Sequence, residues 1–237
     1  MKLSPPAASR IGIPIAAAAI LMIAGCTSVN RLAEFAVQGQ TLAADMRLPP
    51  EPDMDVQLNL KLDFSNLFGT AMNVGSNIAK AANANRVDRL MREALQVVDV
   101  PAIVRDESYA TCLTVLGAQE ESDPGSAQYL LGLDIHRYGI HASSWTSEVE
   151  LRIKLTAILY QNQERVVVWR RDVDVEREAT PAMFGLDPTV GNFVTTAALA
   201  SMSEESLQNG FDQLARDAAQ EIARTLQDDL YAARFGY

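Results

Sequence analysis

The clearest patterns along the chain are runs in which apolar and polar residues alternate. In residues 56–64 every even position is apolar and every odd position is polar. In residues 148–160 every odd position from Val149 to Leu159 is apolar, and the even positions from Glu150 to Thr156 are polar. This period of two is typical of a strand with one buried face, and residues 129–138 and 165–176 are also strand-like. The four-residue link between the last two runs predicts a hairpin.

Other segments have a helical period. Residues 86–98 carry apolar positions three and four apart, and Pro101 ends or interrupts that helix. Residues 109–116 favour a helix, whereas 119–126 and 180–194 carry the proline and glycine typical of loops. The last helix starts near residues 201–204, and its apolar stripe comprises Phe211, Leu214, Ala218, Ile222, Leu226 and Leu230.

The order of these elements predicts the fold class. A strand, a helix, three strands and a helix, with short antiparallel connections, indicate an α+β fold. We expect a mostly antiparallel sheet with helices on one face and the long C-terminal helix docked on the apolar row of residues 149–159. Residues 55–237 then form a single domain. Residues 27–48 have a roughly helical spacing before the prolines at 49–52, and we interpret 26–54 as the lipidated N-terminus and a tether.

The first residues predict an exported protein. Lys2 and Arg10 precede the apolar run 11–23, which is too short to span a bilayer and is typical of a signal peptide. The run ends in Ile23-Ala24-Gly25-Cys26, which resembles the lipobox of bacterial lipoproteins. The resemblance implies that residues 1–25 are removed and that Cys26 carries the lipid, palmitate included, giving a stable membrane anchor. Thr27 stands where the enterobacterial sorting rule has aspartate for inner-membrane retention, which implies the periplasmic face of the outer membrane.

Composition narrows the classes of partner. The chain is 48% hydrophobic, enough for one good core. Without residues 1–25 it has 18 basic and 30 acidic residues, a formal net charge of −12. This charge argues against nucleic acid or anionic headgroups as the main partners.

A family resemblance follows from the central strand. Residues 127–139, Ala-Gln-Tyr-Leu-Leu-Gly-Leu-Asp-Ile-His-Arg-Tyr-Gly, resemble the strand that opens the hairpin half of several small periplasmic lipoproteins. These are the curli-secretion lipoprotein, the penicillin-binding-protein activator lipoprotein and the N-terminal domain of the Tol-Pal translocation protein. The pattern is also similar to auxiliary lipoproteins of lipid-trafficking ABC transporters. The resemblance implies a binding or assembly component of envelope biogenesis that is not an enzyme.

Few residues offer catalytic chemistry. His136 and His141 are the only histidines, and on a regular strand they would face opposite sides of the sheet. Asp134 shares the face of His136, so the two could meet a cation or act in a small periplasmic hydrolase, the rival class. The sequence contains none of the common metalloprotease, phosphate-loop or nucleophile-elbow motifs, so we expect no cofactor and no metal. Cys112 is either a small buried hydrophobe or a reactive thiol.

Several exposed positions are candidates for partner binding. The charged residues within 148–154 and 170–176 form either cross-strand pairs on a solvated face or a polar binding face. Trp145, Met183 and Phe184 lie in polar or loop-like segments and either anchor a partner or pack over the edge of the core. We expect an envelope protein or further copies of the chain as the partner. A lipid held in a groove lined by Phe184 to Leu186 is the alternative.

Overall fold

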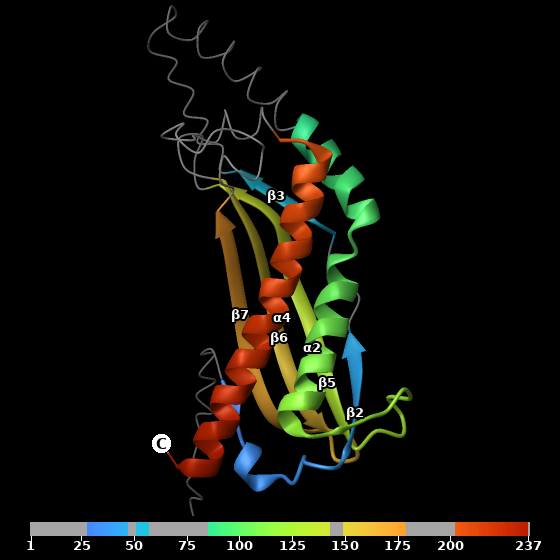
Figure 1. The fold of residues 1–237 in the computed structure, drawn as a ribbon, viewed down its shortest axis with the longest axis vertical. Helices are drawn as coiled ribbons and strands as arrows, with labels where there is room; N and C mark the ends of the chain where they lie inside the picture. Colours follow the sequence, from blue (N-terminus) through green and yellow to red (C-terminus); the bar gives the residue numbers. More distant parts are fainter. Residues whose placement is uncertain (1–27, 47–50, 57–84, 143–148, 179–201, 237) are drawn as a thin grey trace, which may run out of the picture.

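The computed structural model describes residues 28–46, 51–56, 85–142, 149–178 and 202–236 (Figure 1). The strands are β1 (Val29–Asn30), β2 (Thr41–Met46), β3 (Asp53–Val56), β4 (Gln119–Glu120), β5 (Tyr129–Ala142), β6 (Glu150–Gln161) and β7 (Val166–Glu178). The helical elements are the short 3-10 helix η1 (Leu32–Glu34), a helix over 85–97, α2 (Val100–Leu116) and α4 (Glu204–Phe235). The predicted strand beyond residue 56 and the predicted loop at 180–194 lie outside the described residues.

The strands form one seven-stranded mixed sheet with the order β1-β7-β6-β5-β2-β4, in which β3 also pairs with β5. The long strands β5, β6 and β7 are joined as antiparallel hairpins, as predicted, and β1 is antiparallel to β7. However, β2 and β3 run parallel to β5, and β4 runs parallel to β2. The α+β class is therefore confirmed, and the sheet is mixed because distant segments pair in parallel with β5.

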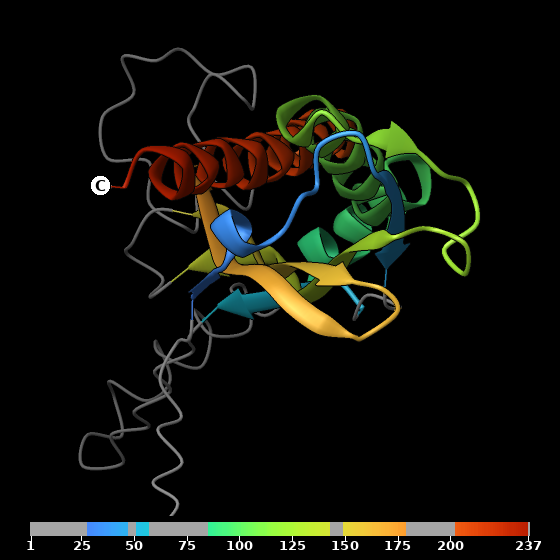
Figure 2. The ribbon, with the colours of Figure 1, turned by 90° about the horizontal axis from the view of Figure 1, so that it is seen from below.

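All the long helices cover the same face of the sheet (Figures 1 and 2). The side chain of Asp99 caps α2 by accepting from the backbone N–H of Ala102, and Pro101 lies in the first turn, where its missing N–H costs nothing. Ser203 and Ser206 form a reciprocal capping box at the start of α4. The predicted helices over 86–98, 109–116 and the C-terminus are confirmed.

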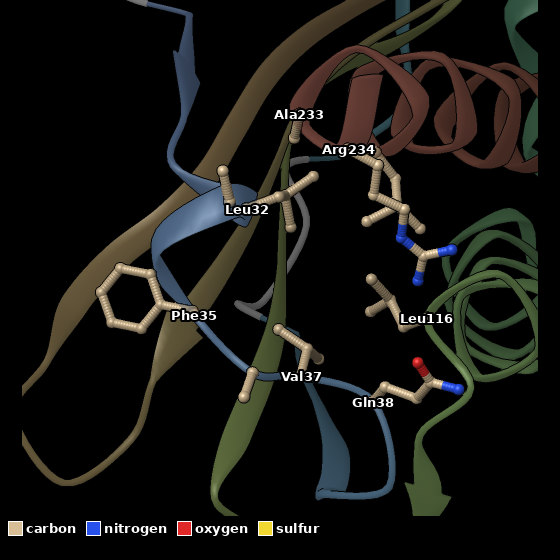
Figure 3. Close-up of a pocket in the computed structure, with 10 residues that line it drawn as sticks. Leu32, Phe35, Val37, Gln38, Leu116, Ala233 and Arg234 are labelled. Atoms are coloured by element: carbon tan, nitrogen blue, oxygen red, sulfur yellow. The ribbon is translucent and has the colours of Figure 1, made fainter. Parts of the chain in front are cut away.

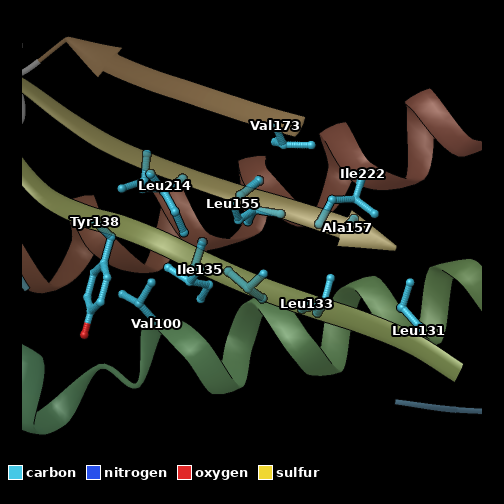
Figure 4. Packing of buried hydrophobic residues seen from close by; sticks show 14 of the residues in the cluster. Val100, Leu131, Leu133, Ile135, Tyr138, Leu155, Ala157, Val173, Leu214 and Ile222 are labelled. Carbon is cyan, nitrogen blue, oxygen red and sulfur yellow. The ribbon is translucent and has the colours of Figure 1, made fainter. Parts of the chain in front are cut away.

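The core lies between the helices and this sheet face. Buried side chains from β5 and β6 point toward α2 and α4, and Figure 4 shows Ala157 of β6 beside Ile222 of α4. The stripe of α4 is buried from Phe211 to Leu226, in agreement with its predicted docking on the sheet. The C-terminal helix is therefore part of the fold over most of its length.

The segment before β3 differs from its prediction. Residues 41–46 form β2, and its Leu42 and Ala43 are buried against β5. The helical spacing was misleading because two consecutive residues of β2, Leu42 and Ala43, are both buried, so the segment lacks the alternation of a half-buried strand. The tether interpretation is thus wrong for residues 28–46, which belong to the folded body.

A β-bulge in β5 changes which side chains face the core. Ile135 pairs with Leu155 and Arg137 pairs with Lys154, so His136 has no opposite residue on β6 in the strand register. Before the bulge odd positions such as Ile135 are buried, and after it even positions such as Ile140 are buried. His141 follows Ile140 and pairs with Glu150 on the face away from the helices. The two histidines therefore share the outer face, and the prediction that they face opposite sides is wrong.

Within the described residues, no helix combines the length and the apolar character needed to span a bilayer.

Candidate functional site

Most residues predicted to form sites lie outside the described part of the chain. These are the lipobox residues Ile23, Ala24 and Gly25, the lipidation site Cys26, and the partner candidates Trp145, Met183 and Phe184. Their roles stay predictions. The histidines, the charged strips and Cys112 can be placed.

The charged strips form a network of cross-strand pairs on the outer face. Arg152 donates from Nε and Nη2 to the two carboxylate oxygens of Asp174 at 2.8 and 2.6 Å, and Nη2 also lies 2.6 Å from Glu176. Lys154 Nζ is 3.0 Å from Asp174. The hydrogen bond from Arg152 lowers the pKa of Asp174 below its usual range. These charges neutralise one another, as expected of a solvated sheet face.

His136 is part of a short hydrogen-bond chain. The hydroxyl of the buried Thr156 donates to Asp172 at 2.7 Å and so accepts from His136 Nε2, also at 2.7 Å. The imidazole is thus held by the sheet through a threonine and not directly by a carboxylate. Among the described residues, no three histidine, cysteine, aspartate or glutamate side chains are grouped closely enough to hold a metal ion.

Cys112 lies on the buried face of α2. Its side chain is inaccessible, and burial raises the pKa of the thiol to about 12. A thiol with this pKa is protonated at neutral pH and is a poor nucleophile. Of the two alternatives for Cys112, a small buried hydrophobic residue or a reactive thiol, the structure therefore favours the first.

A polar cluster joins α4 to the edge of the sheet. Asp229 accepts from the Trp169 indole Nε1 at 2.7 Å and from Arg171 Nε and Nη2 at 2.7 and 2.6 Å. Its backbone carbonyl accepts from the Asn30 side chain at 2.9 Å. The end of α4 is therefore fixed to both β7 and β1.

Next to this cluster, an apolar cleft of about 530 Å³ opens between η1 and the ends of α2 and α4 (Figure 3). Its walls include Leu32, Val37 and Leu116, with Gln38 and Arg234 as the polar groups. Sequence analysis missed this site because residues 28–46 were interpreted as a tether. The hydrophobic triplet Leu32, Phe35 and Val37 was the available signal.

A second cleft lies on the other side of Leu230 and Arg234, which line both. Tyr231 and Phe235 border it with rings 4.5 Å apart. Their residues are 57% and 62% exposed, and Val97 is the other large hydrophobic residue that is mainly exposed in the described part of the chain. We name this surface, formed by Leu230, Tyr231, Arg234 and Phe235, the terminal patch.

Comparisons with known proteins give little further guidance. No protein-family model matches the chain, and no curated protein matches it. A candidate lipoprotein from Caulobacter crescentus is 20% identical over 56% of this chain and 83% of its own, with a TM-score of 0.33. A Xanthomonas campestris protein of the family DUF330 is 18% identical over 49% of this chain and 54% of its own, with a TM-score of 0.32. Likenesses at this level carry no conclusion about function. Neither description names the lipoprotein families to which the central strand is similar, so that resemblance stays a prediction.

Proposed function

We propose that the chain is an envelope lipoprotein anchored through Cys26, on the periplasmic face of the outer membrane, and that it acts as a non-enzymatic binding or assembly component. The observation that carries this proposal is that the lipobox-like cysteine precedes, by only three residues of sequence, a strand of the folded body. Cys26 lies three residues before Val29, which pairs with Arg170 of β7. Val29 is partly exposed and Asn30 is exposed, so β1 begins at the surface, where an acylated residue close by can reach a bilayer.

The arrangement of reactive groups supports a binding role over catalysis. The imidazole of His136 contacts a threonine hydroxyl, and the carboxylate of Asp172 contacts that same hydroxyl, so this carboxylate reaches the histidine only through the threonine, unlike the direct pair typical of a general base. The Cys112 thiol is protonated and inaccessible. The rival hydrolase would depend on Asp134 and His136. His136→Ala should leave function intact in a folded protein, and complete loss of function would favour the hydrolase.

The anchor is tested with the two cysteines of the chain. Cys26→Ala should abolish incorporation of labelled palmitate and retention in the membrane fraction. Cys112→Ala is the matched control, because it removes the other thiol from a buried position and should leave labelling unchanged. Palmitate incorporated into the Cys26→Ala protein would contradict the proposal.

The assignment to the outer membrane is tested by substitutions at Thr27, the residue after Cys26. In an enterobacterial host, Thr27→Asp should shift the protein from the outer- to the inner-membrane fraction of a density gradient, and Thr27→Asn should not. An unchanged distribution of Thr27→Asp would contradict sorting by this position.

The binding role is tested by cross-linking in intact cells followed by purification of the lipidated protein. We expect a defined envelope protein, or further copies of this chain, to be captured in stoichiometric amount. Stoichiometric lipid in the same sample, measured by mass spectrometry, would favour an auxiliary lipoprotein of a lipid-transport system instead.

A further inference from the structure

We propose that the terminal patch docks on the bilayer surface, with the rings of Tyr231 and Phe235 at the level of the lipid headgroups and Arg234 beside their phosphates. This inference rests on the proposed anchor at Cys26, because the anchor decides which end of the molecule faces the membrane.

The first argument is the reach of the chain. Three residues span at most about 11 Å, so the Cα atom of an acylated Cys26 lies within that distance of Val29. The next residue, Asn30, donates to the carbonyl of Asp229. From Asp229, α4 runs on past β1 for six residues, about 9 Å at 1.5 Å per residue, and ends at Phe235 (Figure 1). The start of β1 and the end of α4 therefore lie at the same end of the molecule, and the anchor is at most about 11 Å from Val29.

The second argument is the chemistry of the patch. Aromatic residues are enriched where membrane meets water, because the rings are apolar and a tyrosine hydroxyl stays hydrated. Tyr231 and Phe235 are four residues apart, so they project from one side of the helix. The core stripe of α4 lies on the opposite side of the helix, so the exposed rings of Tyr231 and Phe235 are not part of the core.

The third argument is charge. The whole chain has a formal charge of −10, which would repel phosphate. Two acidic side chains close to the patch are paired: Asp229 binds Arg171, and Glu34 binds Arg31. Arg234 has no acidic partner among the described residues. Within the described part of the chain, Arg234 is thus a cation that the patch can offer to phosphate without first breaking an ion pair.

The test uses the lipidated protein, with acylation verified by mass spectrometry, in vesicles of phosphatidylethanolamine and phosphatidylglycerol that contain brominated lipid. Phe235→Trp places a fluorophore in the patch, and Val97→Trp places a matched one at an exposed position, 69% accessible, on a different helix. The emission of Trp145 and Trp169 is subtracted with the unmodified protein. All three proteins should melt alike, because both replaced side chains are mainly exposed.

We expect the added emission of Phe235→Trp to fall at least about twofold on brominated vesicles, since an indole at the headgroup level contacts the brominated chains, and that of Val97→Trp to stay constant. Equal responses of the two variants in an acylated protein would overturn the docking while leaving the anchor intact. A dimer in solution that is dissociated by Tyr231→Ser/Phe235→Ser would also overturn it, in favour of a second copy as the occupant. An unacylated protein would overturn both proposals.

Discussion

Replacing Asp229 with alanine should destabilise the protein strongly, because this carboxylate joins α4 to the sheet. The side chain of Asp229 is 14% exposed and that of Arg171 is 23% exposed, so the pair is largely shielded from water. The substitution removes three hydrogen bonds of 2.6–2.7 Å and leaves the guanidinium and the Trp169 indole N–H without an acceptor. It leaves the backbone contact with Asn30 in place.

The size of the effect follows from this geometry. Removing one partner of a buried pair costs about 3–5 kcal/mol, and the partial exposure of Arg171 places the expected value near the lower limit. A loss of about 3 kcal/mol corresponds to a fall in Tm of about 6–12 °C for a domain of this size. Asp228 is the matched control: its side chain is 65% exposed and pairs at 3.0 Å with Arg224 one turn away. Asp228→Ala should cost at most about 0.5 kcal/mol.

The assay is urea unfolding of the purified protein, followed by circular dichroism. Four variants are compared with the unmodified protein: Asp229→Ala, the control Asp228→Ala, Arg171→Leu, and the double variant Arg171→Leu/Asp229→Ala. The double variant should be more stable than the sum of its single losses predicts, because no charge is left unpaired. The reasoning is refuted if Asp229→Ala lies within about 1 kcal/mol of Asp228→Ala, or if the two single losses add without coupling.

Three further predictions concern the core, acid stability and the thiol. Ile222→Asp should unfold the protein, since a buried carboxylate without a partner costs more than about 4 kcal/mol, whereas Gln220→Asp on the exposed side should leave Tm nearly unchanged. If Ile222→Asp kept its Tm, α4 would not be a core helix. The pKa of Asp174 is lowered in the folded protein below its ordinary 3.8, so its pair with Arg152 contributes stability above that pH and loses it as the pH falls through the folded pKa. Asp174→Asn should therefore show a shallower fall of Tm below pH 4, and an unchanged slope would contradict this. Cys112 should react with a disulfide reagent only at the rate of unfolding, because burial raises its pKa to about 12; rapid labelling of the native protein would contradict its burial.

The elements that could be predicted from sequence are those whose pattern is set by a single buried face. From Val149, just before β6, to Leu159 every odd position is apolar and buried. The stripe of α4 is equally regular, since a helix on a sheet buries one side throughout. In such segments the apolar pattern of the sequence identifies the side that packs against the core.

The rest depends on contacts between distant parts of the chain. β2 pairs with β5, which lies almost ninety residues further on, and no local pattern of residues 41–46 shows that pairing. The apolar cleft is likewise built from η1 and from the ends of two helices that follow much later. Its residues could be found in the sequence, but their proximity is a property of the topology. The terminal patch was missed because Tyr231 and Phe235 lie on the side of α4 away from its apolar stripe.

The β-bulge makes His136 the residue of β5 that has no opposite residue on β6. Substituting this residue changes one side chain on the outer face, whereas deleting it would restore strict alternation along β5. In that shortened strand Tyr138 and Ile140 would stay on the buried face and Arg137 and His141 on the outer face, because the pair of Arg137 and Lys154 already follows directly on the pair of Ile135 and Leu155. A residue gained or lost at this point therefore alters the twist and bending of the strand and leaves the composition of its buried face unchanged.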